Sequence, residues 1–520
     1  MFNISSPYQE ALPGDQSGNL ASRLTPGVAW SLADPTLVLK PKILAVSAAV
    51  ADLLHVDVAS VSRSESVEIL TGNRVAPGSK PYAMAYGGHQ FGGWAGQLGD
   101  GRAIVLGTHT NTSGDRFDLQ LKGAGRTPYS RRADGRAVLR SSLREFVCSE
   151  AMHHLGVPTT RALSLALSGE GVVRDMFYDG HPATEPGAIV CRVSPSFVRF
   201  GHFELPRANG DVPLLRSLVD FTIREYFHEI DAKFSGEEKV AAFLNEVAER
   251  TARLMSQWMR VGFVHGVMNT DNMSVLGLTL DYGPYGFVED FDPRFTPNTT
   301  DSEGRRYCFG AQPHVALWNV ERLAVALSPL FSSEKPLADA VAAFAKRFDR
   351  ETVEMLARKF GFDAIRDEAD DVLVQDAFAL MQRAELDFTI FFRALALLDA
   401  ESPRVEVLAP AAYRDEVFAA CRADLEAWLA RYASRVAKNQ GSALDRRRSM
   451  NATNPSVVFR NYLAQEAIDD VMGGSTTKLE SLMRAFERPY DDGEEQLAIA
   501  SRRPEWARVR AGCSMLSCSS

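Results

Sequence analysis

A short segment after residue 260 combines side chains that could hold a divalent metal against phosphate. His265 is followed seven residues later by Asn272, which stands directly after Asp271, and nine residues further on comes Asp281 in Asp-Tyr-Gly. Carboxylate and amide oxygens are the hard ligands that Mg²⁺ takes when phosphate oxygens and water complete its shell. The segment therefore predicts a metal-dependent nucleotide site, and Asp271 could also accept a proton there.

The spacing resembles the active site of protein kinases with one part moved. In kinases an Asp stands two residues and a metal-binding Asn seven residues after the His, and a later Asp-Phe-Gly Asp also holds magnesium. Here the second position is Val267, whereas a carboxylate, Asp271, stands beside the Asn. We therefore expect a nucleotide site whose chemistry differs from that of a kinase.

A lysine and a glutamate upstream fit the pair that positions phosphates in such a site. Strands are predicted at 103–106 and 117–122, and an amphipathic helix from about 136 to 155. Lys122 ends the second strand and Glu145 lies in the helix, 23 residues later. The alternative for Glu145 is a surface ion pair on its own helix, worth about 0.2–0.5 kcal/mol.

A glycine-rich stretch and two later arginines complete the candidate site. Residues 86–107 contain eight glycines, a density typical of turns and close backbone approach, and Gly99-Asp-Gly-Arg102 is predicted to be a phosphate-facing turn. Arg192 and Arg199 lie at the end of a predicted buried strand, 188–193, and just beyond it. Guanidinium groups bind phosphate bidentately, although structural salt bridges would equally explain both.

Composition excludes several classes of protein. The 520 residues carry a net charge of −9, which argues against general nucleic-acid binding. No window reaches the roughly 20 apolar residues that a membrane helix needs, and the N-terminus resembles neither a signal nor a transit peptide. Six scattered cysteines form no disulfide or zinc pattern, so we expect a protein of the reducing cytosol.

The remaining chain is predicted to be mainly helical. Helices are expected at 214–234, 237–261, 313–327, within 335–400 and 411–433, and again over 456–486, with a polar linker at 434–455. The predicted divisions are an N-terminal extension (1–80), a β-rich N-lobe (81–200), a helical C-lobe with the catalytic and metal loops (201–330), a helical C-terminal region (331–500) and a flexible Cys-containing tail (501–520).

Several sequence blocks resemble the selenoprotein O (YdiU) family of kinase-fold protein adenylyltransferases. They cover nearly the whole chain: Gly88–Arg102, Leu121–Ser130, Asp134–Ser142, Phe200–Glu204, His265–Gly286, Ala316–Arg322 and the Cys-Ser-Ser ending. The resemblance implies an α+β, protein-kinase-like bilobal fold with a small β-rich N-lobe, a mainly helical C-lobe and a helical C-terminal extension.

The same resemblance implies a reaction and a set of site residues. ATP would bind flipped relative to kinases, and AMP would pass to Ser, Thr or Tyr of proteins with release of pyrophosphate. Asp271 would be the base, Asn272 and Asp281 would hold Mg²⁺, with Mn²⁺ as an alternative, and Cys518 would have a redox role. The residues expected to contact ATP are Gly99, Gly101, Arg102, Lys122, Asp134, Gly135, Arg192, Arg199 and Asp281, with Glu145 pairing Lys122.

Two other functions stay open on the sequence. A kinase with a relocated base would transfer the γ-phosphate, and a pseudokinase scaffold would only bind ATP; the missing Asp at position 267 favours the scaffold. Use of UTP is a further possibility. The expected partners are ATP and protein substrates, without nucleic acid or membrane, in the bacterial cytoplasm or, for a eukaryotic chain, in mitochondria.

Overall fold

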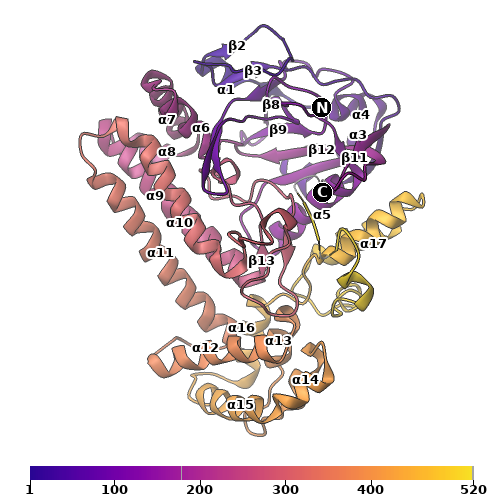
Figure 1. The fold of residues 1–520 in the computed structure, drawn as a ribbon, viewed down its shortest axis with the longest axis vertical. Helices are drawn as coiled ribbons and strands as arrows, with labels where there is room; N and C mark the ends of the chain where they lie inside the picture. The colour runs from indigo at the N-terminus through magenta and orange to yellow at the C-terminus, as the bar shows by residue number, and fades with distance from the viewer. Residues whose placement is uncertain (177–178, 514, 518–520) are drawn as a thin grey trace.

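The chain is of the α+β class, as predicted (Figure 1). The computed structural model describes residues 1–176, 179–513 and 515–517. A ten-stranded sheet has the order β2-β3-β5-β8-β9-β12-β11-β4, with β1 paired to β8 and β10 to β12. Its strands are β1 (Ile4–Ser5), β2 (Gly14–Asp15), β3 (Trp30–Leu32), β4 (Lys42–Val46), β5 (Tyr82–Met84), β8 (Ala103–Thr110), β9 (Arg116–Lys122), β10 (Ala137–Val138), β11 (Arg161–Arg174) and β12 (Ala183–Ser194).

The three strands predicted from the sequence are the central ones, β8, β9 and β12. Their residues alternate between the two faces of the sheet, as strand geometry requires. On β12, Ala188 and Val190 pack into the same core as helix α5 (Leu139–His154), whereas Ile189 and Cys191 pack with α2 (Ala48–Leu53) and α4 (Ser64–Thr71). Helices thus cover both faces, which explains why β12 is apolar throughout its second half.

The N-terminal segment belongs to this sheet rather than standing apart from it. Residues 1–80 supply β1 to β4 and the helices α1 (Pro7–Ala11), α2, α3 (Val58–Val61) and α4. β4 pairs with β11, and β3 pairs with β5. Neither β4 nor the long β11 was predicted from the sequence.

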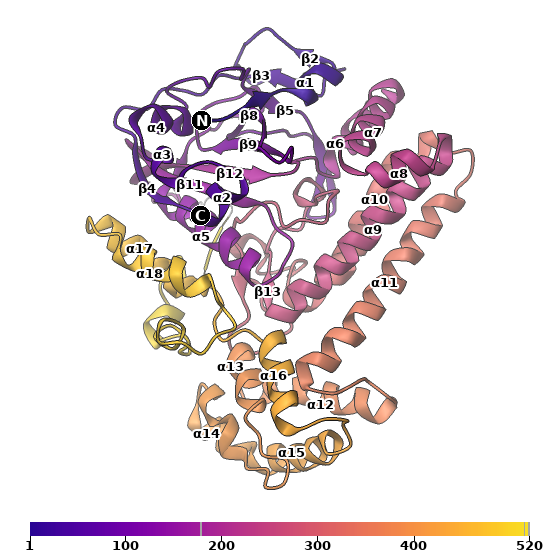
Figure 2. The ribbon, with the colours of Figure 1, turned by 180° about the vertical axis from the view of Figure 1, so that it is seen from behind.

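Helices form the other half of the molecule (Figures 1 and 2). The long helices α9 and α11 lie side by side along one flank, α12 to α16 lie at the end remote from the sheet, and α17 and α18 return to α5. Their bounds are α6 (Gly201–Ala208), α7 (Val212–Tyr226), α8 (His228–Lys233), α9 (Gly236–Val261), α10 (Gln312–Leu327), α11 (Lys335–Phe360), α12 (Glu368–Arg383), α13 (Phe388–Leu395), α14 (Asp415–Ala420), α15 (Arg422–Val436), α16 (Ala443–Thr453), α17 (Asn461–Met472), α18 (Thr477–Phe486) and α19 (Glu494–Leu497).

Several helix boundaries differ from the prediction for local reasons. The helix expected over 214–234 is divided between α7 and α8, because Phe227 leaves the helical region with φ −130° and ψ 54°. α11 ends at Gly361, a left-handed cap with φ +70°. The linker expected at 434–455 was wrong, since it contains α16, whose N-terminus has a capping box formed by Ser442 and Asp445.

The tail was expected to be flexible, but its described residues near the end are held by the fold. Leu516 is buried. Its N–H donates to the carbonyl of Pro297 at 3.1 Å, and its own carbonyl accepts from the N–H of Thr299 at 2.8 Å. Backbone pairing with a distant loop leaves no periodic pattern in the sequence, which is why this contact was not predicted.

Candidate active site

Three cationic side chains converge on the carboxylate of Asp281. Lys122 Nζ lies 3.2 Å from Asp281 Oδ1, Arg199 Nη1 lies 2.8 Å from Oδ2, and Arg192 Nη1 also contacts Oδ1. Lys122 comes from the end of β9 and Arg192 from β12, adjacent strands, whereas Arg199 follows β12. The sheet and the segment after the loop at residues 265–272 therefore meet at Asp281.

Glu145 closes the cluster from the opposite side. Its Oε2 lies 2.8 Å from Lys122 Nζ, and its Oε1 lies 3.1 Å from Arg192 Nη1. The side chain is buried in α5, so this is an interior pair and not the surface pair that the sequence left open. Three cations thus contact two carboxylates directly, and the buried carboxyl groups of Asp100 and Asp271 lie within electrostatic range of Arg199. Guanidinium and ammonium groups gathered in this way are suited to bind a phosphate group.

The charges of this cluster fix the ionisation of Asp281. Burial by itself would raise the pKa of the carboxyl group, but Lys122, Arg192 and Arg199 outweigh burial and hold that pKa well below its ordinary value. Asp281 is therefore a carboxylate throughout the physiological range.

Asp271 has a different environment, although it lies close to the same cations. Its side chain is buried, Oδ2 accepts from Gln90 Nε2 at 3.2 Å, and Oδ1 has no partner among the described residues. Arg199 donates to the backbone carbonyl of Asp271 at 2.8 Å, not to its carboxylate. Burial raises the pKa of Asp271 to about 7, against the opposing effects of Arg199 and Gln90. An unpaired buried carboxyl oxygen is a suitable proton acceptor.

Asn272 and His265 hold the loop in shape. The side-chain amide of Asn272 donates to the carbonyl of Val267 at 2.8 Å, which leaves Oδ1 available as a ligand. His265 is buried and stacks on Trp258 with ring centroids 5.3 Å apart. Burial lowers the pKa of His265 to about 4, so the imidazole is neutral.

The turn at Gly99–Arg102 is shaped by its packing on Tyr129. Gly99 has φ +100°, and a Cβ there would lie 2.4 Å from the Tyr129 ring; a Cβ on Gly101 would lie 2.9 Å from the Tyr129 carbonyl. Asp100 is buried and accepts from Met84 N–H at 3.1 Å. The Arg102 carbonyl accepts from the backbone of Gly123 at 2.7 Å, so the turn adjoins the residue after Lys122.

Asp134 and Gly135 lie in a loop that closes on itself. A Cβ on Gly135, where φ is +72°, would lie 2.1 Å from the carbonyl of Gly125. Asp134 accepts two hydrogen bonds from Arg174, at 2.7 and 2.9 Å. Its carboxylate is exposed, and its predicted contact with ATP would compete with this bidentate pair.

A hairpin that the sequence did not predict covers the loop that carries Asp271. β6 (Gly87–Gln90) and β7 (Gly93–Gln97) form a separate two-stranded sheet. His89 N–H donates to Thr270 Oγ1 at 2.7 Å, and Gln90 contacts Asp271 as described above. The eight-glycine stretch marked this segment, but no local pattern indicated which loop it would cover.

A second missed contribution comes from Gln120. Its Oε1 accepts from Arg192 Nη2, and its Nε2 donates to Asp100 Oδ2 at 3.2 Å. Gln120 therefore ties the guanidinium of Arg192 to the turn at Gly99–Arg102. It lies two residues before Lys122 on the same strand face, which is the signal that could have identified it.

The side-chain oxygen atoms at this site fit a magnesium ion whose coordination shell is completed by phosphate oxygens. Asn272 and Asp281 supply hard oxygen atoms. The amide nitrogen of Asn272 makes the bond to Val267, and its Oδ1 accepts no hydrogen bond from the described residues. No cluster of three or more His, Cys, Asp or Glu side chains suited to a metal occurs in the described part of the chain. Cys518, the predicted redox residue, lies outside the described residues.

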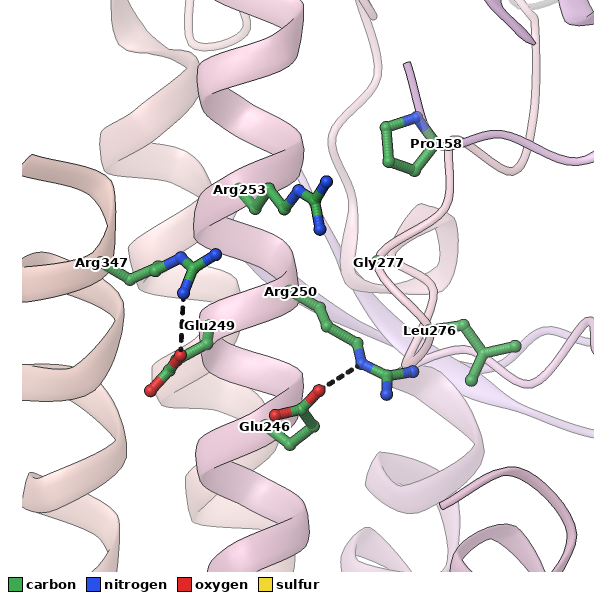
Figure 3. A pocket seen from close by; sticks show the side chains of 8 residues that line it. All are labelled: Pro158, Glu246, Glu249, Arg250, Arg253, Leu276, Gly277 and Arg347. Carbon is green, nitrogen blue, oxygen red and sulfur yellow. Dashed lines mark hydrogen bonds and ion pairs between the residues drawn. The ribbon is translucent and has the colours of Figure 1, made fainter. Parts of the chain in front are cut away.

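A hollow elsewhere contains none of the predicted residues. It has a volume of about 350 Å³ and lies beside α9, where Arg250, Arg253 and Glu249 line it together with Gly277 (Figure 3). Arg250 is paired with Glu246 at 2.7 Å.

None of the helices in the described ranges has the length and apolarity to cross a membrane.

Comparison with known proteins first defines the class of this chain. It is 54% identical to the protein nucleotidyltransferase YdiU of Aromatoleum aromaticum, over 99% of both chains. It is 52% identical to that of Methylobacillus flagellatus over the full length of both, and 55% identical to that of Xanthomonas campestris pv. campestris over 98% of both. The chain is thus an enzyme of the nucleotidyltransferase class.

The family follows from a match that covers most of the sequence. Residues 32–487 match the family described as protein adenylyltransferase SelO. The chain belongs to the SelO family, as its sequence blocks predicted.

Proposed function

We propose that this enzyme transfers AMP from ATP to Ser, Thr or Tyr hydroxyl groups of proteins and releases pyrophosphate. The observation that carries the proposal is the convergence of Lys122, Arg192 and Arg199 on Asp281. These three cations are in direct contact with only two carboxylates, those of Glu145 and Asp281. Guanidinium and ammonium groups gathered in this way are suited to bind a triphosphate.

A kinase-like bilobal fold is part of the proposal. Lys122 on a central strand pairs with Glu145 on the following helix, and Asn272 and Asp281 follow the long helix α9. This order of elements supports the division into a β-rich N-lobe, a helical C-lobe and a helical C-terminal extension.

The two buried arginines support a flipped nucleotide. Arg192 and Arg199 stand behind Asp281 in the interior, each with a side chain 3% exposed. A terminal phosphate held by these guanidinium groups would lie deep in the site, and the α-phosphate would then face the acceptor near Asp271. Gly99, Gly101, Arg102, Asp134 and Gly135 would border the remainder of ATP.

Asp271 would act as the base. Its unpaired Oδ1 takes the proton of the acceptor hydroxyl group, and the acceptor oxygen forms a bond to the α-phosphorus of ATP. The bond from the α-phosphorus to the bridging oxygen breaks, and pyrophosphate leaves with that electron pair. The cationic side chains of Lys122, Arg192 and Arg199 stabilise the charge that develops on pyrophosphate.

Asn272 and Asp281 would hold Mg²⁺ or Mn²⁺, which, when bound, offsets negative charge on the phosphate oxygens. Gln90 orients Asp271, and the Val267 carbonyl orients Asn272. The similar proteins named above are bacterial, and we place this reaction in the bacterial cytoplasm.

Paired incubations with ATP labelled at the α- or the γ-phosphate test the function. With Mg²⁺ and denaturing electrophoresis, we expect label on protein from the α-phosphate only. Label from the γ-phosphate only would establish a kinase. Binding of ATP without any transfer of label would establish a scaffold.

A further inference from the structure

The turn of the β6–β7 hairpin holds a bulky residue in an unfavourable conformation. Phe91 and Gly92 form the two-residue turn, with φ +51° and +85°. Such turns favour Asn, Asp or Gly at both positions, and a bulky side chain at positive φ is an outlier that often marks a functional site. Phe91 N–H donates to Tyr307 Oη at 2.9 Å and to Asn269 Oδ1 at 3.2 Å, which stabilises the turn.

The strained turn keeps an apolar side chain in solvent. Phe91 and Trp94 are each 42% exposed. The ring centroid of Trp94 lies 5.2 Å from that of His89, and the ring centroid of Trp318 in α10 lies 5.5 Å from the same imidazole. Exposed aromatic groups gathered at one place are typical of a surface that binds another molecule.

Positive charge borders these aromatic groups. The guanidinium groups of Arg306 and Arg322 lie 4.8 and 5.0 Å from the Trp318 ring centroid. Arg306 forms no ion pair with a carboxylate among the described residues, and its buried Nε has no hydrogen-bond partner there. Arg322 approaches only Glu321, at 3.9 Å. Among the described residues neither guanidinium group makes a short ion pair, so both can pair with an acidic partner.

The surface is continuous with the proposed reaction site. Gln90, next to the strained turn, donates to Asp271 at 3.2 Å. Asn319, next to Trp318, donates to the Met268 carbonyl at 2.9 Å and so anchors α10 to the same loop. A polypeptide lying on the aromatic groups would have its neighbouring residues beside Asp271.

We propose that Phe91, Trp94, Trp318, Arg306 and Arg322, together the hairpin surface, bind the acceptor polypeptide. The hairpin surface selects segments in which an acidic and an apolar side chain flank the hydroxyl-bearing residue. The apolar side chain packs on Phe91 and Trp94, and the acidic one pairs with Arg306 and Arg322. This inference rests on the proposed function and specifies its acceptor.

Synthetic peptides with one tyrosine test the selection. One peptide has Asp and Leu beside the tyrosine, a second has Lys and Leu, and a third has Asp and Ser. With α-labelled ATP, we expect KM for the first peptide to be about tenfold lower than for the Asp-Ser peptide, the factor expected for an aromatic anchor. We expect it to be about two- to fivefold lower than for the Lys-Leu peptide, the factor expected for a surface charge pair. Equal KM values for the three peptides would overturn the inference.

Two variants and a matched control assign the effect to residues. Trp94→Ala is expected to raise KM for the Asp-Leu peptide about tenfold with kcat nearly constant, and Arg306→Gln to abolish the preference for Asp over Lys. Trp506→Ala is the control, since Trp506 is 40% exposed but lies in the C-terminal region. Parental KM values in Trp94→Ala and Arg306→Gln would exclude the hairpin surface. If either variant fails to fold, the other decides.

Binding of the same peptides without ATP separates this inference from the proposed function. Fluorescence anisotropy of labelled peptides should rank the three peptides in the same order. An enzyme that transfers no α-label but binds the Asp-Leu peptide through Trp94 would disprove the proposed reaction and keep the surface. Transfer of α-label at equal KM to all three peptides would support the proposed reaction and disprove the role of the hairpin surface.

Discussion

Asn272 donates its side-chain amide to the backbone carbonyl of Val267 at 2.8 Å. Val267 stands two residues after His265, where a kinase has its catalytic Asp, and here its backbone carbonyl supports Asn272, the proposed metal ligand. The bond fixes the amide nitrogen and turns Oδ1 away from it. The carboxylate of this loop stands instead at Asp271, directly before Asn272.

Replacing Asn272 by Ala should remove both the proposed ligand and this support. We expect the rate of label transfer to fall at least ~10–100-fold, the range for outer partners of metal ligands, and the Mg²⁺ concentration for half-maximal rate to rise. A Mg²⁺ titration measures both. Asn73→Ala is the control. The side-chain amide of Asn73 also donates to a backbone carbonyl, that of Val38 at 2.9 Å, but Asn73 is not among the residues of the proposed site. An unchanged Mg²⁺ dependence in Asn272→Ala would remove Asn272 from the metal site.

Replacing Asp271 by Asn keeps the size of the side chain but removes the base. The rate of adenylyl transfer should fall about 10²–10⁴-fold, the usual contribution of general base catalysis, while ATP still binds. Single-turnover transfer of α-label and a separate ATP-binding titration distinguish the two effects. Transfer at the parental rate would show that Asp271 is not the base.

Replacing Glu145 by Gln should destabilise the fold as well as the site. Lys122 and Arg192 would lose a buried partner, and breaking a buried pair costs about 3–5 kcal/mol. Glu225→Gln is the matched control: Glu225 pairs with Arg116 at 2.7 Å, but Arg116 is 42% exposed, so the expected cost is about 0–1 kcal/mol. Urea denaturation compares the two, and similar midpoints would contradict a structural role for Glu145.

Two glycines separate the effect of φ from that of close packing. In Gly99→Ala the added Cβ would lie 2.4 Å from the Tyr129 ring, whereas at Gly96, where φ is +76°, no atom lies within 4 Å. Both variants have backbone strain of roughly 1–3 kcal/mol, but only Gly99→Ala must also displace a ring. We expect thermal melting to fall further for Gly99→Ala. Equal melting temperatures would mean that Tyr129 moves without cost.

Asp118 should make the stability of the N-terminal sheet depend on pH. Burial raises its pKa to about 7 despite a hydrogen bond from Thr108 and the charge of Arg116, and Glu225 raises it further. The folded pKa of this acid lies above its unfolded value. The folded state therefore binds the proton more tightly, and stability falls as the pH rises from about 4 to about 7.

Asp118→Asn removes this titration and should therefore raise the stability of the protein relative to the parent at high pH. Each pKa unit corresponds to about 1.4 kcal/mol, so the variant should gain about 2–3 kcal/mol relative to the parent between pH 5 and pH 8. Urea denaturation at the two pH values measures the change. If the free energies of unfolding of the variant and the parent differ by the same amount at pH 5 and at pH 8, the raised pKa of Asp118 is contradicted.

The sequence by itself determined the residue types, the α+β class and the central strands. The order from Lys122 through Glu145 to Asn272 and Asp281 predicted a nucleotide site, because those residue types have few other uses at that spacing. Hydrophobic periodicity located β8, β9, β12 and α5, since each buries a continuous or alternating apolar face. The sequence blocks also predicted the family.

Tertiary structure alone decided which groups meet. Arg192 and Arg199 share the carboxylate of Asp281, and the β6–β7 hairpin covers Asp271. These contacts join residues that are 82 to 181 positions apart in the sequence. The contact of Leu516 with Pro297 and Thr299 is of the same kind. Local patterns record which face of an element is buried, but the choice of a distant partner depends on the packing of the whole chain.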